Sequence, residues 1–185
     1  MVRRIEILAQ WLLDDRSWRG VEKLLELLSK ISVGSLEKIS AIQSLAGQVL
    51  STLCQKQILT LLTDEYLLED EQQEVIRNIL GVFGPQAALY HLGRLILSLS
   101  KEERISLINL IPVFGDQVGP VLYECLKSKP PWYVVRNVVY IIGAIGSDDN
   151  YSMIEHYLDH RDERVQYEVI CSVIKIDGPS LVSRL

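Results

Sequence analysis

The chain has 185 residues, of which 48% are hydrophobic and 23% charged, so it has enough apolar side chains for a continuous core and lacks the composition of a disordered protein. Its formal net charge of −5 argues against general nucleic-acid binding, because that affinity comes from Lys and Arg neutralising phosphates. Its apolar runs are shorter than the roughly 20 residues of a membrane span and its N-terminus lacks a secretory signal pattern, so we expect a cytoplasmic protein that binds no membrane.

The first third of the chain has the apolar periodicity of amphipathic helices. A helix is predicted over residues 3–14, and its apolar face is formed by Ile5, Leu8, Trp11 and Leu12. Gly34 and Ser35 break the pattern that follows, and Ser35 has the side chain of an N-cap. The further helices predicted here cover residues 21–31, 36–46 and 49–62.

An acidic stretch follows at residues 64–74. We interpret it as a solvated connector, whose carboxylates also favour the positive N-terminal end of the next helix. The alternative interpretation is a docking site for a basic partner.

From residue 72 onward, glycines divide the chain into similar units. The stretch 130–146 begins with two prolines and ends in Gly143-Ala144-Ile145-Gly146, and related endings occur elsewhere. The closing glycines are Gly84, Gly115, Gly146 and Gly178, separated by 31, 31 and 32 residues (115−84, 146−115 and 178−146). This period is typical of helical repeats. A weaker example of the same glycine-terminated pattern ends at Gly47. Glycine suits these positions because it tolerates a left-handed backbone just past a helix end.

Each regular unit is predicted to hold an outer helix, a tight turn and a second helix that ends at the glycine. Outer helices are predicted over residues 86–99, 117–127 and 150–158, and second helices over residues 72–83, 101–114, 131–145 and 163–176. The β-branched run 134–145 resembles a strand in composition, but its length, its Pro-Pro start and its register with the other units predict a helix.

One stretch carries a family resemblance. Residues 160–170 read His-Arg-Asp-Glu-Arg-Val-Gln-Tyr-Glu-Val-Ile, which is similar to the D-x-x-V-R-x-E-A pattern of bacterial HEAT-like repeats of the PBS-lyase type, with Gln166 where arginine is usual. The resemblance covers residues 72–178 well and 20–71 loosely. It implies an all-α fold, a right-handed α-solenoid of about five HEAT-like helical hairpins plus an N-terminal helix.

We therefore expect a single repeat domain over residues 1–185, irregular over 1–71 and regular over 72–178. Residues 179–185 resemble the start of another helix, and no polar cap closes the stack. This end predicts either a longer protein or self-association through the last repeat.

A column of polar or amphipathic residues lies six positions before each closing glycine. Its members are Asn78, Asn109, Tyr140 and Ser172. Because their neighbours are apolar, we expect the column to face solvent on the concave surface lined by the second helices.

Tyr133, Arg136 and Tyr140 share one side of their helix at i, i+3 and i+7, and Tyr167 is placed on the same surface. Tyr and Arg are enriched among residues that dominate protein-binding energy, which predicts a protein or peptide partner here. The alternative is that the tyrosines half-cover the helix surface and Arg136 pairs with a neighbouring carboxylate.

The sequence offers no recognisable catalytic or metal site. His156 and His160 have the i, i+4 spacing of two metal ligands, but no third ligand is indicated, and we predict no metal and no cofactor. Cys54, Cys125 and Cys171 lack clustered spacing and are predicted to be reduced core residues. There is no phosphate-binding loop or nucleophile elbow, and His91 is expected at the surface or in packing.

The resemblance adds three activities to consider. Some HEAT-repeat hydroxylases bind iron through His-Glu pairs at the positions of Tyr167-Glu168 and Arg136-Asn137 here, so that activity is not expected. A non-catalytic scaffold that holds a protein or peptide is favoured. The alternative is a bilin-lyase-like subunit acting on a chromophore protein, and a DNA-glycosylase-like protein is disfavoured by the acidic balance.

Overall fold

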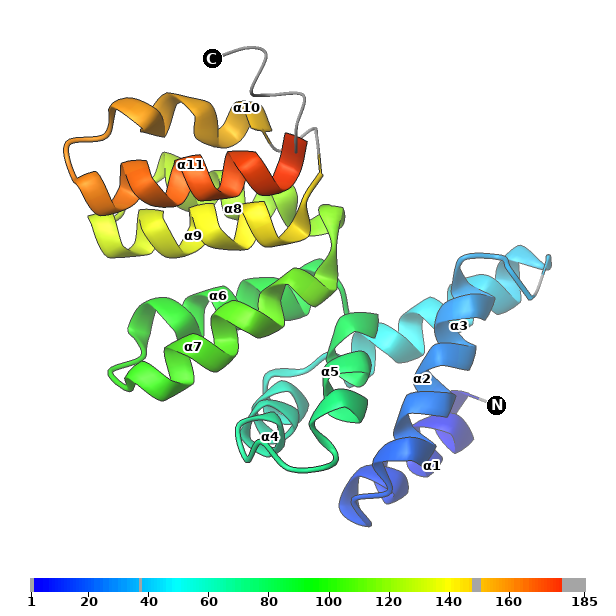
Figure 1. The fold of residues 1–185 in the computed structure, drawn as a ribbon. Coiled ribbons are helices and arrows are strands. Elements are labelled where there is room, and N and C mark those ends of the chain that lie inside the picture. The colour runs from blue at the N-terminus through cyan, green and yellow to red at the C-terminus, as the bar shows by residue number, and fades with distance from the viewer. Residues whose placement is uncertain (1, 37, 148–150, 178–185) are drawn as a thin grey trace. The chain divides into compact units, whose positions relative to one another are not determined.

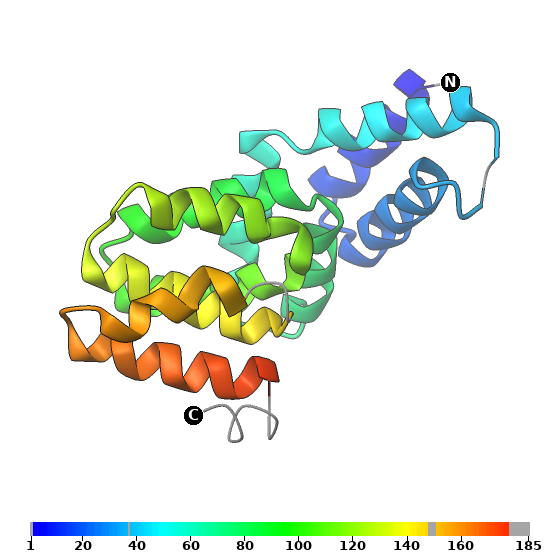
Figure 2. The same cartoon turned by 90° about the horizontal axis from the view of Figure 1, so that it is seen from above.

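The computed structural model describes residues 2–36, 38–147 and 151–177. Every regular element in these ranges is a helix (Figures 1 and 2), which confirms the all-α class. The β-branched run is helical, as predicted, within α9 (Trp132–Ile145). The predicted C-terminal helix start at 179–185, with its role in self-association, and the closing glycine Gly178 lie outside the described residues.

Contacts within the chain divide it into two compact units, Met1–Tyr90 and His91–Leu185. The boundary lies inside one helix, α6 (Pro85–Leu97), which matches the outer helix predicted over 86–99. The sequence instead indicated one domain whose regularity changes near residue 71.

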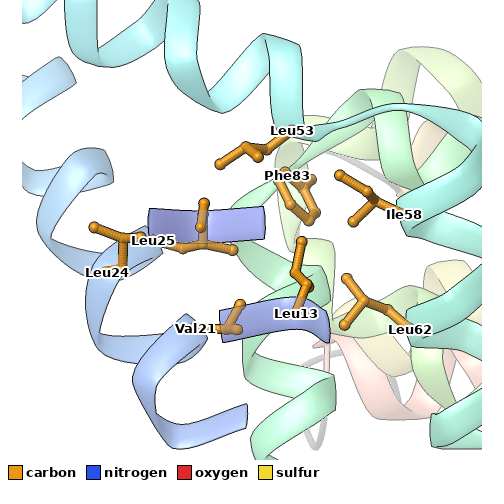
Figure 3. A pocket seen from close by; sticks show the side chains of 9 residues that line it. Leu13, Val21, Leu24, Leu25, Leu53, Ile58, Leu62 and Phe83 are labelled. Carbon is orange, nitrogen blue, oxygen red and sulfur yellow. The ribbon is translucent and has the colours of Figure 1, made fainter. Parts of the chain in front are cut away.

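The first unit packs its helices around an apolar centre. Its elements are α1 (Val2–Asp14), α2 (Trp18–Ser32), α3 (Ser40–Leu53), α4 (Lys56–Tyr66) and α5 (Gln73–Val82). Helix α2 contacts α1, α3 and α5, while α4 packs on α5. Figure 3 shows side chains from separate helices, among them Leu13, Leu25, Leu62 and Phe83, pointing toward a common cavity of about 10 Å³. A space this small and apolar is a packing gap, since even one water molecule needs polar partners.

The helix boundaries between residues 36 and 62 differ from the prediction. Gly47 lies inside α3 rather than at a helix end, and the break falls at Cys54 and Gln55. The apolar series Ala46, Val49 and Leu53 is buried across the glycine, and this packing outweighs the roughly 1 kcal/mol that glycine costs inside a helix. Helix α3 begins at Ser40, so Ser35 is not its N-cap.

The buried face of α1 is also different. Ala9 and Leu13 are buried, whereas Leu8 is exposed and Trp11 is 60% exposed, so the predicted face was wrong for these two residues. A small side chain at position 9 allows close helix packing, and Leu13, one turn later, completes the buried face.

The acidic stretch is a connector only in part. Helix α4 continues to Tyr66, so Asp64 and Glu65 are helical. Glu65 is buried, and its Oε1 lies 2.9 Å from Nη1 of Arg16. The solvated connector that the sequence predicted is confined to the exposed acidic residues from Glu69 to Glu71.

The second unit contains a succession of similar helices. After α6 come α7 (Lys101–Leu110), η1 (Ile111–Phe114), η2 (Asp116–Val118), α8 (Gly119–Lys127), α9, α10 (Tyr151–Ile154), η4 (Glu155–Asp159) and α11 (Glu163–Asp177). Helix α9 packs against both α7 and α11, and these three second helices run in the same direction (Figure 1). Helix α8 packs on α9, and α10 and η4 pack on α11.

The described closing glycines all have positive φ, but the predicted left-handed helical conformation is not adopted by Gly115, whose ψ is −160°. Gly84, Gly115 and Gly146 have φ values of 59°, 65° and 75°. Gly146 caps α9 in the left-handed conformation, and its N–H donates to the carbonyl of Ile142 at 3.2 Å. The short 3-10 segments η1, η2 and η4 interrupt helices that the sequence predicted as continuous.

Within the described ranges, no single helix combines the length and hydrophobicity of a membrane span. The segments Lys101–Phe114 and Asp116–Lys127, bent by 109°, would meet those requirements together by length and composition only.

Candidate functional site

A groove of about 280 Å³ lies on the layer of second helices in the second unit. It is lined by Ile105, Ile108 and Asn109 of α7, Arg136, Asn137 and Tyr140 of α9, and Glu168 of α11. Three consecutive second helices therefore build one concave surface. Its lining combines an apolar pair on α7 with polar and charged side chains on α9 and α11.

Asn137 is the most deeply placed polar residue of the groove. It is only 6% exposed, although its side chain lines the groove. Its Oδ1 accepts a hydrogen bond of 3.0 Å from Nη2 of Arg136. This bond fixes the amide orientation, so the Nδ2 donors are the end of the side chain left for a groove occupant.

Two cation–aromatic contacts join α9 to α11 beside the groove. The ammonium group of Lys175 lies 4.6 Å from the ring centre of Tyr140. The guanidinium of Arg164 lies 3.4 Å from the ring centre of Trp132, and its Nη2 is 2.8 Å from Oδ2 of Asp162. Bonding to Arg164 lowers the pKa of Asp162 below its ordinary value. These contacts fix the aromatic side chains of α9 in position.

The structure brings together three of the predicted site residues and separates the others. Asn109, Arg136 and Tyr140 line the groove. Tyr133 and Tyr167 are exposed, Tyr167 by 69%, but do not line it. The alternative interpretation paired Arg136 with a carboxylate, whereas the structure bonds it to Asn137.

Two members of the predicted polar column behave differently. Asn78 belongs to the first unit, is exposed, and donates from Nδ2 to Oε1 of Glu22 at 2.9 Å. Ser172 is fully buried, so the prediction that it faces solvent was wrong. Its Oγ donates to the carbonyl of Val139 at 3.1 Å, because Ser172 packs closely on α9 beside Gly143.

The sequence contained a signal for residues that were missed. Position ten before a closing glycine is occupied by Ile105, Arg136 and Glu168 (115−105, 146−136 and 178−168), and all three line the groove. The prediction was based on the polar column six positions before the glycines, so it did not include Ile105 and Glu168. Asn137 had no such signal, since the register aligns it with Ser106 and Val169.

The two histidines do not share a face in the structure. His156 lies inside η4 and His160 is its C-cap, and the three residues per turn of this helix place i and i+4 on different sides. Nδ1 of His160 accepts a 3.0 Å hydrogen bond from the backbone N–H of Asp162. In the described parts of the chain, no three His, Cys, Asp or Glu side chains are grouped to hold a metal. His91 is buried with its ring 5.6 Å from that of Phe114, so it is a packing residue.

The three cysteines are free thiols of intermediate exposure, rather than the core residues predicted. Burial raises the pKa of Cys54 to about 11 and raises the pKa of Cys125 as well. Thiols with raised pKa values are poor nucleophiles at neutral pH, because the thiolate is the reactive form.

Comparison with protein-family models, with curated proteins and with solved structures finds no match to this chain.

Proposed function

We propose that the chain is a non-catalytic scaffold of the HEAT-like, α-solenoid type, which binds a protein or peptide in the groove between α7, α9 and α11. The observation that carries the proposal is the groove itself, built by three consecutive second helices. The glycine spacing and the parallel course of these helices support the repeat architecture.

The size and lining of the groove favour a peptide over a large enclosed ligand. Small-molecule sites usually occupy about 300–1,000 Å³ and bury most of the ligand. The groove of about 280 Å³ has Ile105 and Ile108 on α7, Arg136 on α9 and Glu168 on α11. Its volume instead suits one or two side chains of a partner. Exposed Tyr133 and Tyr167 extend the surface beyond the groove with a residue type enriched in interfaces.

The proposal is tested with a double substitution, Tyr133→Ala with Arg136→Ala. Partners are captured from an extract of the source organism on the wild-type chain, identified, and titrated against both proteins by calorimetry. We expect affinity to fall by about tenfold or more, since hot-spot side chains contribute roughly 1–2 kcal/mol or more each.

The matched control is Tyr123→Ala with Lys127→Ala on α8, where both residues are exposed and neither lines the groove. This pair should leave the affinity unchanged. Equal affinities of the groove variant and the wild type would show that this surface is not the site. A coloured adduct formed with a bilin would favour the chromophore-related alternative instead.

A further inference from the structure

The groove is lined by an amide group whose donors a bound molecule can reach. In the described part of the chain, the side chain of Asn137 makes one hydrogen bond, through Oδ1 to Arg136. Although the residue as a whole is 6% exposed, its Nδ2 keeps contact with solvent, because the buried side-chain atom that lacks a partner among the described residues is Nε of Arg77. Because Asn137 lines the groove, an acceptor on a bound molecule can replace the solvent at Nδ2.

The neighbouring guanidinium strengthens this preference. Arg136 uses one Nη2 donor on Asn137, and its other N–H groups remain beside the same groove. Arg136 and Asn137 both line the groove, so donors of both residues are available to one bound molecule. Because one of the two groups is cationic, an anionic acceptor makes the strongest hydrogen bonds there.

The surrounding charges also favour an anion. Lys175 adds a second cation next to the groove, over the ring of Tyr140. Neither Arg136 nor Lys175 has a carboxylate within ion-pair distance among the residues that the structure describes. Glu168 is the carboxylate that lines the groove, and it lies on the opposite helix, α11.

We propose that the groove recognises an acidic residue, Asp or Glu, in an extended segment of a protein partner. This inference rests on the proposed function. The carboxylate accepts hydrogen bonds from Arg136 and from Nδ2 of Asn137, while Ile105 and Ile108 contact an adjacent apolar side chain. Glu168 repels a second acidic residue on the α11 side. This repulsion sets the direction in which the bound segment lies in the groove.

The test begins with random capped peptides displayed against the immobilised full chain. We expect the selected peptides to share Asp or Glu at one fixed position. Replacing that residue by its amide in a selected peptide should weaken binding about tenfold or more, because charge-assisted hydrogen bonds are about twice as strong as neutral ones. Binding of the acidic peptide should also weaken as salt is added.

Three variants assign the effect to the groove. Arg136→Gln should weaken the acidic peptide about tenfold, and Glu168→Gln should strengthen it at least about twofold by removing a like charge. The control is Arg161→Gln, an exposed arginine that does not line the groove, and it should change nothing. Loss of folding would weaken peptide binding, so stronger binding by Glu168→Gln cannot result from misfolding.

A direct readout is the side-chain amide resonance of Asn137 in ¹⁵N NMR, which should shift on adding the acidic peptide and not its amide counterpart. The two proposals fail differently. Selected peptides that depend on Arg136 but show no acidic preference, including a preference for phosphate, would overturn this inference alone. Failure to select any peptide, or binding indifferent to both groove variants, would overturn the proposed function with it.

Discussion

Gly143 in the last turn of α9 and Gly146 at its C-cap serve different physical needs. Gly146 adopts the left-handed conformation that stops α9, with φ at +75° and nothing within 4 Å of the place where a Cβ would be. At Gly143 an added Cβ would lie 2.5 Å from Cβ and 2.7 Å from Cα of Ser172. The missing side chain therefore lets α9 and α11 pack with their backbones close together.

Gly143→Ala should destabilise the protein by about 1–3 kcal/mol, because the new methyl group meets a backbone atom that cannot move alone. Urea unfolding followed by circular dichroism measures the change. Gly93→Ala in α6 is the control, since nothing lies within 4 Å of its added Cβ and it should stabilise by about 0.4–1 kcal/mol. Similar stabilities for the two variants would contradict the close packing of α9 on α11.

At the scale of one element, the start of α7 is held by a small polar cluster. Ser100 is the N-cap, and its Oγ accepts the backbone N–H of Glu103 at 3.2 Å. The Glu103 carboxylate accepts 2.6 Å hydrogen bonds from Oγ of Ser98 and from Nε of Arg94. The bond from Ser98, with a further contribution from Arg94, lowers the pKa of Glu103 against the opposing effect of burial.

This cluster makes stability depend on pH with a definite sign. Because the folded-state pKa of Glu103 is lower than its ordinary value of 4.5, its contribution is complete above that value and is lost as pH falls through the folded pKa. Glu103→Gln should lower the free energy of unfolding by about 1 kcal/mol at neutral pH, a magnitude limited by partial solvent exposure.

The difference between Glu103→Gln and wild type should shrink as pH drops below 4.5, measured by urea unfolding across the acid range. Glu124→Gln serves as the control, because the 3.6 Å ion pair of Glu124 with Lys127 is exposed and should matter little. A Glu103→Gln deficit that persisted unchanged in acid would show that the carboxylate charge is not what stabilises α7.

On the scale of the whole molecule, each compact unit has its own buried centre. Ile142 is fully buried in the second unit, and Ile79 is fully buried in the first. In repeat structures each hairpin relies on its neighbours to bury its apolar faces. Loss of one core side chain should therefore affect the adjoining helices as well as its own.

Ile142→Ala should destabilise by about 2–5 kcal/mol, the usual range for emptying a core isoleucine site. Hydrogen exchange should show lost protection in α7 and α11 as well as in α9. Ile79→Ala is the matched control in the first unit, with its main losses expected in α2, α4 and α5. A loss confined to α9 in Ile142→Ala would argue against repeat packing.

Position relative to the closing glycines predicts some residues of the candidate site and not others. Counting from the closing glycines found Asn109 and Tyr140, because residues at equal positions of parallel helices form columns on one surface. The same column placed Ser172 in solvent, and the structure buries it instead. Helix α11 approaches α9 too closely at Gly143 for that position to remain open.

By itself the sequence determined the helical class, the glycine-ended second helices and the absence of strand from the run 134–145, because periodicity and backbone preference are local properties. Only the tertiary structure decided that α3 continues through Gly47, that α1 buries Ala9 rather than Trp11, and that Asn137 lines a groove. These outcomes depend on how closely two helices approach, and that distance is set jointly by side chains far apart in the chain.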